Sequence, residues 1–410
     1  MASSSHKAPA TKFVLPDLVS HCDFPLRVSR HRKQVTGETK QWLFKGDNLT
    51  NPKIRERFHG LKCGTLTAMC YPDAGCPQLR VCNDFLTYLF HLDNLSDDMD
   101  THGTQTTADT VLNALYHPHT DRSQARVAKM TRDYYKRMVA TASPGTQRRF
   151  IETFDFFFQS VTQQAMDRDA GVIPDLESYI ALRRDTSGCK PSFALIEYAN
   201  NLDIPDEVME HPLLMSLTEA ANDLVTWSND IFSYNVEQSK GDTHNMIPVV
   251  MSEQGLDLQA AIDFVGDMCK GSIDRFNEDR AQLPSWGEKV DRDVAVYVDG
   301  LADWIVGCVL VCYPVTAVAN FAWAVLCTGR SPPRVTLGRL ARQSKPVVLW
   351  TCFPPGYDLI QLRVGNFPLN IDYRGDSFGS IELPSPAVAP HSRLLRMDKH
   401  AQKPPTTYLT

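Results

Sequence analysis

The sequence lacks any run of five or six basic residues, and its 48 Asp and Glu side chains outnumber its 42 Lys and Arg, giving a formal net charge of -6. A chain without a basic patch has no electrostatic reason to bind nucleic acid. Its first residues, MASSSHKAPATKFVLPDL, contain no continuous apolar stretch of the kind that directs secretion. We therefore expect a cytoplasmic protein with no nucleic-acid partner, and the acidic clusters become the features of interest.

The sequence also lacks a CxxC pair, although it contains eleven cysteines. The group formed by Cys63, Cys70, Cys76 and Cys82 is spaced too widely for a zinc knuckle or a redox pair. Because the number is odd and no leader is recognisable, nothing points to a disulfide framework. We expect reduced thiols.

In long segments of the chain, apolar residues recur every three or four positions. Between about residues 53 and 307 these segments are broken by Pro and Gly, and few alternating runs that would form strands occur. This periodicity predicts an all-α body, which is large enough at 410 residues and 43% apolar content to enclose a site. The expected helices cover residues 78–97, 107–116, 123–141, 147–167, 174–184, 192–201, 211–236 and 258–277.

The composition changes near both ends of the chain. Residues 1–12 are small and polar, which predicts a disordered tail, and residues 13–325 form the expected helical domain. Residues 326–410 are rich in Pro and Arg and scatter short β-prone pieces such as VVLWTCF and LIQLRV. We expect an atypical, poorly ordered extension there.

An acidic cluster follows the apolar segment that contains Phe90. Asp93, Asp97 and Asp100 stand at i, i+4 and i+7, which lines them up on one helical face. Carboxylates stacked in this way repel one another unless a cation compensates, and Mg²⁺ prefers such oxygen ligands. Asp93 and Asp97 are therefore candidate metal ligands at the mouth of a pocket. The alternatives are a solvated acidic helix end and, for Phe90, an ordinary core position.

A second polar stripe offers three different oxygen donors. Asn229, Ser233 and Glu237 place an amide, a hydroxyl and a carboxylate at i, i+4 and i+8. Together they could hold one Mg²⁺ while water and a substrate phosphate complete its shell, and Lys240 could reach the same anion. The alternative is the plain polar face of an amphipathic helix. A near repeat that lacks only the final Glu precedes the stripe: Asn222, Thr226 and Asp230.

Two arginines end the helix expected over residues 174–184. Arg183 and Arg184 precede a Thr-Ser-Gly turn, which places guanidinium groups beside a flexible break. The planar guanidinium suits phosphate recognition because it donates two hydrogen bonds at once. The alternative is a solvent-facing basic pair of the kind favoured at a helix C-terminus.

These motifs together resemble those of fungal class I terpene cyclases. Asp93-Asn94-Leu95-Ser96-Asp97 is similar to the DNxxD form of the family's aspartate-rich motif, and Asn229, Ser233 and Glu237 match its NSE triad. Arg183 stands where the family keeps a diphosphate-sensing arginine, and the helix break that follows it matches as well. The region from residue 93 to 118 is also similar to the subgroup that makes protoilludene-like skeletons.

The resemblance implies an all-α class I terpenoid synthase bundle with a central active-site cavity, followed here by an irregular C-terminal tail. It implies a monomeric or homodimeric sesquiterpene synthase that ionises farnesyl diphosphate, an isoprenyl diphosphate, with three Mg²⁺ ions, cyclises the carbocation and releases diphosphate. The site residues implied are catalytic Asp93, Arg183, Asn229, Ser233 and Glu237; metal-binding Asp93, Asp97, Asn229, Ser233 and Glu237; diphosphate-binding Arg183, Lys240 and Asn229; and cavity-wall Phe90, Ser187 and Trp304.

The likeness ends abruptly near Gly307. The segment LADWIVG still resembles the family, but the Arg-Tyr pair that the family keeps on a late helix is missing, because no arginine occurs between Arg292 and Arg330. Pro314 would also break a helix there, so the last helix is in doubt after residue 307. So sudden a change favours an altered reading frame or a retained intron. Sequencing the transcript across the Gly307 codon tests this, since an mRNA that encodes the following residues as written would contradict it.

Three other interpretations remain open. The damaged end favours an inactive terpene-synthase-like protein, because the closing residues are missing. The uncharged stretch from Trp304 to Gly329 is long enough for a membrane anchor, although Pro314 and Asn320 argue against one. A chain-elongating prenyltransferase would also use metal and diphosphate, but it resembles this chain less because it would carry two DDxxD motifs.

Overall fold

Helices form nearly all of the described structure. The computed structural model describes residues 12–44, 62–96, 99–240, 243–312, 349–351, 359–364 and 367–372. The helices are α1 Arg32–Leu43, α3 Cys63–Cys70, α4 Cys76–Ser96, α5 Thr101–Tyr116, α6 Arg126–Val139, α7 Pro144–Ala170, α8 Leu176–Thr186, α9 Cys189–Asn200, α10 Asp206–Met209, α11 Pro212–Lys240, α12 Met246–Gln254, α13 Leu258–Ala281 and α14 Glu288–Cys312. The all-α fold predicted from the apolar periodicity is confirmed.

Four short strands accompany the helices. They are β1 Lys12–Val14, β2 Leu349–Thr351, β3 Leu359–Val364 and β4 Phe367–Asp372. β1 pairs antiparallel with β2, placing Phe13 opposite Trp350, and β3 pairs antiparallel with β4, placing Ile360 opposite Ile371. The β-prone pieces VVLWTCF and LIQLRV contain β2 and β3. The remaining residues of the expected N-terminal tail and C-terminal extension lie outside the described chain.

Capping residues explain where several helices begin and end. The side chains of Ser143, Asp175 and Asp257 accept hydrogen bonds from backbone N–H groups in the first turns of α7, α8 and α13. Gly171 and Gly255 end α7 and α12 in the left-handed conformation that glycine adopts without strain. These local signals are why the boundaries expected from sequence lie within a few residues of those observed for most of the helices.

The first acidic stripe is shorter than predicted. α4 ends at Ser96, and Asp100 is the N-cap of α5, where its side chain accepts a hydrogen bond from Gly103 N–H. The prediction that Asp100 shares a helical face with Asp93 is therefore wrong. Aspartate is among the best N-cap residues, and this preference decided the outcome. The same cap starts α5 at Thr101, earlier than the expected residue 107.

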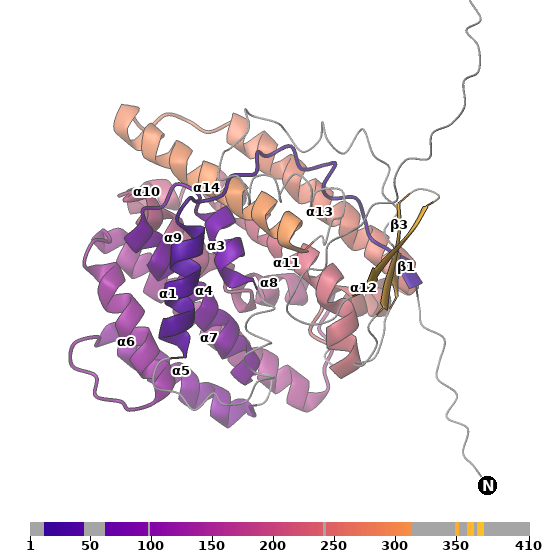
Figure 1. Ribbon diagram of the computed structural model, residues 1–410, viewed down its shortest axis with the longest axis horizontal. Helices are drawn as coiled ribbons and strands as arrows, with labels where there is room; N and C mark the ends of the chain where they lie inside the picture. Colours follow the sequence, from indigo (N-terminus) through magenta and orange to yellow (C-terminus); the bar gives the residue numbers. More distant parts are fainter. Residues whose placement is uncertain are drawn as a thin grey trace, which may run out of the picture.

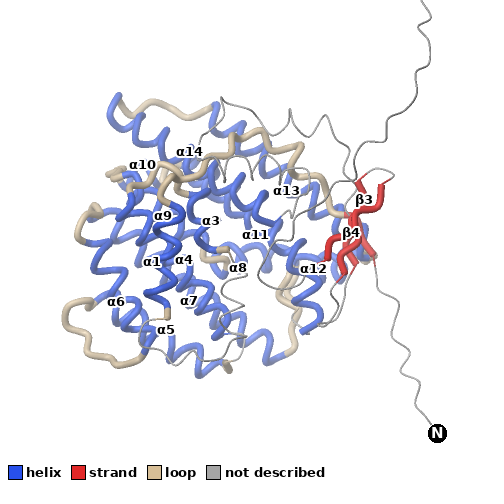
Figure 2. The backbone as a smooth tube through the Cα atoms, in the orientation of Figure 1, coloured by secondary structure: helices blue, strands red, loops and turns tan. Residues whose placement is uncertain are grey.

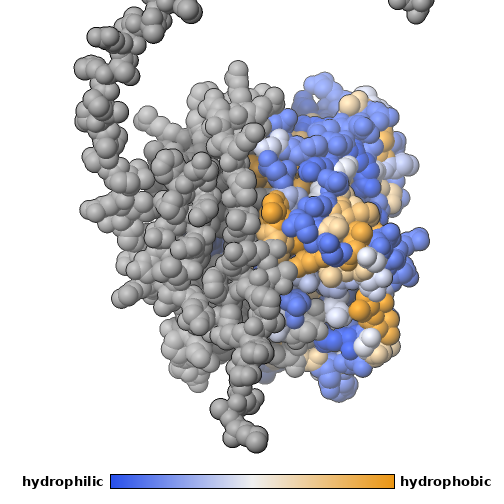
Figure 3. Space-filling model, turned by 90° about the vertical axis from the view of Figure 1, so that its right-hand side faces the viewer, coloured by the Kyte–Doolittle hydropathy of each residue, from blue (hydrophilic) through white to orange (hydrophobic). Residues whose placement is uncertain are grey.

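α4 and α11 each pack against several other helices. Figure 1 shows α13 and α14 along the upper side and α5, α6 and α7 along the lower side, and Figure 2 shows the same arrangement as a tube. α11 packs against α8, α9, α12, α13 and α14, whereas α4 packs against α1, α3, α6 and α9. On the described part of the face in Figure 3, apolar side chains form separate patches between polar ones.

Aromatic rings fill the core between α4 and the helices α6 and α7. Phe85 of α4 meets Tyr134 of α6 and Phe150 and Phe154 of α7 at ring-centroid distances of 5.8, 5.1 and 5.4 Å, all edge to face. Such geometry aligns the positive ring edge with a negative ring face. These contacts fix α4 against α6 and α7, and so fix which of its faces turns toward α11.

α14 is apolar enough to span a membrane, yet it lies in the core. Its segment Glu288–Val311 passes a length and hydropathy test for a membrane span, but 78% of its apolar window is buried inside the bundle. Trp304 and Val309 are buried, and the helix continues past Gly307 to Cys312. It ends two residues before Pro314, as expected for a chain approaching proline. The rest of the uncharged stretch lies outside the described residues.

Buried carboxylates paired with arginine tie the helices together. Among the described residues, the buried acidic side chains are Asp84, Glu197, Asp223, Asp230 and Asp303, and each forms an ion pair with an arginine. Asp84 accepts hydrogen bonds from Thr39 of α1 at 2.6 Å, Arg80 of α4 at 2.8 Å and Arg137 of α6 at 2.8 Å. One carboxylate thus joins three helices.

Replacing Arg80 by alanine should lower the free energy of unfolding by about 2 kcal/mol, because the Asp84 carboxylate stays buried with fewer donors. A shift of the denaturant midpoint measures the loss. Arg292→Ala is the control, since that arginine pairs with Glu288 at the surface, where its side chain is 67% exposed. Equal midpoints for the two variants would contradict the assignment of Asp84 as a buried anchor.

Candidate active site

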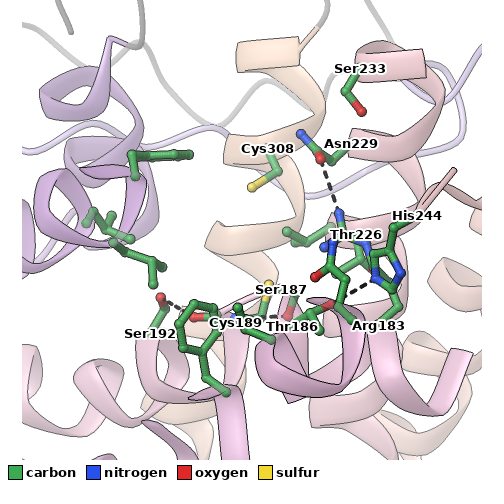
Figure 4. A pocket seen from close by; sticks show the side chains of 18 of the residues that line it. Arg183, Thr186, Ser187, Cys189, Ser192, Thr226, Asn229, Ser233, His244 and Cys308 are labelled. Atoms are coloured by element: carbon green, nitrogen blue, oxygen red, sulfur yellow. Dashed lines mark hydrogen bonds between the residues drawn. The ribbon is translucent and has the colours of Figure 1, made fainter. Parts of the chain in front are cut away.

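A cavity of about 500 Å³ lies between α4, α7, α8, α9, α11 and α14. Its apolar walls are formed by Leu66, Leu86, Leu89, Phe90, Phe157, Val161, Val225, Trp304 and Val311. Its polar groups include Arg183, Asn229, Ser233, Glu237 and His244. In Figure 4 the side chains of Arg183, Asn229, Thr226 and His244 gather together, while Cys308 reaches in from α14. A mostly apolar hollow with a few convergent polar groups is the usual form of a ligand site.

The predicted stripe on α11 lies on the cavity wall. Asn229, Ser233 and Glu237 all line it, as their spacing of four residues along a helix requires. The buried Ser233 hydroxyl makes no hydrogen bond of normal geometry with the described residues, though it lies close enough to Glu237 to lower the pKa of that carboxyl. A buried hydroxyl without a regular partner fits a position that a bound cation would satisfy.

The Glu237 carboxyl lies in a partly buried position close to Asp230. Burial, followed by repulsion from Asp230, raises the pKa of the Glu237 carboxyl to about 7, and this outweighs the hydrogen bond that Asn245 donates at 2.8 Å. Asn245 also caps α12 and donates to the Asp230 carbonyl oxygen at 2.8 Å. Its place just before an apolar helical run was the available sequence signal for this residue. The Glu237 carboxyl is thus fixed in place, and the nearby charge of Arg183 offsets only part of the effects of burial and of Asp230 on its pKa.

The helix that carries the acidic motif faces the same cavity. Leu86, Leu89 and Phe90 of α4 line it. Phe90 therefore lies on the cavity wall, as predicted. Asp93 follows Leu89 by one helical turn in α4, but its side chain is outside the described set. Asp97 and the side chain of Lys240 also lie outside it. The backbone therefore brings the two predicted motif helices to one cavity.

Arg183 stands beside the stripe. Its guanidinium donates to Asp230 at 2.8 and 3.1 Å and to the Asn229 amide oxygen at 3.2 Å. Burial alone would lower the pKa of Arg183, but the charges of Asp230, Tyr179 and Glu237 outweigh it and raise that pKa. The group is a permanent cation that also orients Asn229, so the basic pair expected from sequence is not a solvated helix end at this residue.

The second arginine serves a different purpose. Arg184 donates to the buried Asp223 at 2.7 and 2.8 Å, and Arg275 of α13 donates to the same carboxylate at 2.7 Å. Arg184 is absent from the residues that line the cavity, so its role is to hold α8 against α11 and α13.

The break between α8 and α9 forms part of the wall. Ser187 and Gly188 line the cavity, and Gly188 has a φ of +68°. A Cβ atom at Gly188 would stand 2.6 Å from Leu89 Cδ2, so glycine is required both for the backbone conformation and for the approach of α4. Pro191 has no N–H to offer the Ser187 carbonyl in the next turn. The break therefore leaves that carbonyl outside the regular helical ladder.

Asp230 and His244 were not among the predicted site residues. Asp230 accepts hydrogen bonds from Tyr179 at 2.6 Å and Met246 N–H at 3.1 Å besides those from Arg183. The near repeat containing Asp230 was the sequence signal for it. His244 lines the cavity, where burial, then Arg183 and Arg168, lower its pKa to about 3. Its imidazole is therefore neutral.

Trp304 lines the wall of the cavity, as predicted. The side chain is buried, and its ring meets Tyr71 at 5.6 Å and Phe193 at 5.7 Å, both edge to face. It lines the cavity together with Cys308 from the next turn of α14. Trp304 is thus both a wall residue and a core residue.

The donor set suits a hard cation. An amide, a hydroxyl and a carboxylate are ligands that Mg²⁺ accepts, and it needs few protein ligands because it keeps waters and binds substrate phosphates. No group of three His, Cys, Asp or Glu placed to hold a metal occurs among the described residues.

A helical bundle that encloses an apolar cavity, with an Asn-Ser-Glu stripe and an arginine at its polar end, defines a class I terpenoid synthase. Residues 84–275 match the family described as terpene synthase family 2, C-terminal metal binding. Sesquiterpene synthase Agr1 of Cyclocybe aegerita is 78% identical over 296 residues, which are 72% of this chain and 85% of that protein. The chain therefore belongs to the terpene synthase family and groups with its fungal sesquiterpene synthases.

Two further similarities extend this comparison. A Delta(6)-protoilludene synthase of Stereum hirsutum is 37% identical over 310 residues, which are 74% of this chain and 83% of that protein, so it is a more distant relative than Agr1. The crystal structure of a linalool/nerolidol synthase from Streptomyces clavuligerus covers 72% of this chain and 98% of its own, with a TM-score of 0.64 and 22% identity. That likeness supports the fold.

Gly188→Ala should lower the free energy of unfolding by about 2 kcal/mol, since the added Cβ strains the backbone and pushes against Leu89. Gly171→Ala is a matched control, because Gly171 has a similar φ of +65° but nothing within 4 Å of the added atom. It should lose about 1 kcal/mol, from the backbone alone. Thermal unfolding of both variants gives the difference, and an equal loss would show that the contact with α4 is not tight.

Proposed function

We propose that this chain is a Mg²⁺-dependent sesquiterpene synthase that ionises farnesyl diphosphate, cyclises the carbocation and releases diphosphate. The observation that carries the proposal is that Arg183, Asn229, Ser233 and Glu237 line the same cavity as a set of aliphatic and aromatic side chains. The volume, about 500 Å³, lies in the range of ordinary small-molecule pockets. An isoprenyl diphosphate has the same two-part chemistry, with an anionic head and an apolar tail.

The polar end is suited to binding the diphosphate. Mg²⁺ would be held by Asn229, Ser233 and Glu237 of α11 together with Asp93 and Asp97 of the acidic motif. Lys240 would contact the diphosphate. Bound Mg²⁺ would stabilise charge on the departing diphosphate oxygens. Arg183 supplies a fixed positive charge beside the position of the diphosphate. The ion pair with Asp230 keeps the guanidinium oriented before substrate arrives.

The apolar end is suited to the carbocation. Phe90, Phe157 and Trp304 line it, and aromatic faces stabilise a passing cation by about 0.5–2 kcal/mol each. Apolar side chains beside the cation would also limit its contact with water, which would otherwise quench it early. His244 is neutral because its pKa is lowered, so it adds no positive charge to repel the cation.

The C-terminal sequence favours a second candidate, an inactive relative. No arginine occurs between Arg292 and Arg330, so the Arg-Tyr pair that the resemblance leads one to expect is absent from this stretch. Loss of that pair would weaken closure over the diphosphate. Turnover and metal binding therefore have to be measured separately.

Purified protein incubated with farnesyl diphosphate and Mg²⁺ should release cyclic sesquiterpenes, detected by gas chromatography and mass spectrometry, and chelation by EDTA should abolish them. Asn229→Ala or Glu237→Gln should lower kcat/KM about 100-fold or more, because each removes an oxygen ligand at the diphosphate end. Gln238→Ala, an exposed change beside Glu237 on α11, serves as the control. Full activity in both site variants would refute the site.

Metal binding tests the site even if turnover is absent. Mn²⁺ binding in the presence of inorganic diphosphate, followed by electron paramagnetic resonance, should weaken about tenfold or more in Glu237→Gln and remain unchanged in Gln238→Ala. Binding without turnover would support the inactive alternative. Unchanged binding in Glu237→Gln would remove Glu237 from the metal site.

A further inference from the structure

The break between α8 and α9 leaves a backbone carbonyl without its helical partner. In an uninterrupted helix the Gly188 N–H would donate to the Arg184 carbonyl, but it donates instead to Asp185 O at 3.5 Å. A buried carbonyl without a donor is costly, so another group has to supply one. The Ser187 hydroxyl lies 3.3 Å from this carbonyl, and the shorter hydrogen bond, at 2.7 Å, comes from the Asn222 side chain of α11.

Asn222 of α11 binds both sides of the break. Its Nδ2 donates to the Arg184 carbonyl at 2.7 Å, and its Oδ1 accepts from the Ser187 hydroxyl at 3.1 Å. Asn222 is 1% exposed and does not itself line the cavity. Ser187 in turn accepts from Cys189 N–H at 3.0 Å, which passes the constraint to the first residue of α9. One amide therefore sets how α8 ends and how α9 begins.

Two ion pairs between α8 and α11 hold the Asn222 amide next to the break. Asp223, the next residue of α11, binds the Arg184 side chain at 2.7 Å, and Asp230 binds Arg183 at 2.8 Å. These ion pairs fix where α8 meets α11. The Asn222 amide then acts at a set distance from the break, so its two hydrogen bonds define the position of Ser187 within narrow limits.

Small movements of the break change the shape of the cavity. Ser187, Gly188, Cys189 and Ser192 all line it, and Gly188 stands against Leu89 of the opposite wall. A reaction steered by wall shape is sensitive to displacements of about 1 Å, even when the residue that moved makes no contact with substrate. Thr226, one turn along α11 from Asn222, also lines the cavity.

We propose that Asn222 is a positioning residue that sets the product specificity of this cavity by fixing the Ser187–Gly188 break. The inference rests on the proposed function, because specificity presupposes turnover. It assigns a role to the near repeat on α11: Asn222 supports the wall, Thr226 forms part of it, and Asp230 holds Arg183. A merely structural asparagine would affect stability and leave the product ratio alone.

The test compares Asn222→Leu and Asn222→Asp with wild type. Leucine removes both hydrogen bonds at similar volume, whereas aspartate keeps the acceptor for Ser187 but loses the donor to Arg184 O. We expect the ratio of sesquiterpene products per turnover to change about threefold or more in both, with kcat lowered about tenfold and KM within about twofold. Ratios per turnover do not depend on the fraction of folded enzyme.

Asn83→Leu is the matched control, since Asn83 is also 1% exposed, accepts one hydrogen bond from Thr67 and does not line the cavity. It should lower stability without changing the product ratio. Ser187→Ala removes the same contact from the other side, so its effect should not add to that of Asn222→Leu. An unchanged ratio in Asn222→Leu, or an equal change in Asn83→Leu, would overturn the proposal.

Hydrogen exchange separates this inference from the proposed function. The backbone amides of residues 185–190 and 192 should exchange about tenfold faster in Asn222→Leu and at the wild-type rate in Asn83→Leu. If wild type releases no terpene, the proposed function fails and the exchange rates alone decide whether Asn222 fixes the break. Wild-type exchange in Asn222→Leu would overturn the inference whatever the activity.

Discussion

The polar end of the cavity depends on one buried carboxylate. Asp230 is 1% exposed and accepts hydrogen bonds from the Tyr179 hydroxyl, the Arg183 guanidinium and the Met246 N–H, so it joins α8, α11 and α12. A buried carboxylate is tolerated only when donors surround it, and each donor is therefore held in place by the need to satisfy it. This fixes Arg183 beside Asn229.

α11 brings together support and chemistry on one face. The near repeat and the oxygen-donor stripe are offset by seven residues, about two helical turns, so both lie along the same side of the helix. Asn222 lies behind the wall, whereas Ser233 and Glu237 lie on it. Two patterns that compete as interpretations of the sequence are consecutive parts of one surface in the structure, because the helix passes from the core to the polar end of the cavity.

Much of the helical architecture follows from local signals. Apolar periodicity and caps such as Ser143 and Asp257 place most helices to within a few residues. The same local chemistry also explains the failure at Asp100, where a good N-cap residue was assigned to the preceding helix. α14 shows a limit of composition, since a strongly apolar helix has the same composition whether protein or lipid surrounds it. Only its packing inside the bundle shows that it belongs to the core.

The sequence by itself determined that the fold is helical and that Asn229, Ser233 and Glu237 share one helical face, because helix periodicity is a property of neighbouring residues. It also placed Arg183 next to a break. Only the tertiary structure decided that Asp230 holds Arg183 and that Asn222 holds the break, because those partners come from helices far apart in the chain. Hydrogen bonds between helices far apart in the chain produce no regular spacing of residues in the sequence, so only the packing of the helices specifies them.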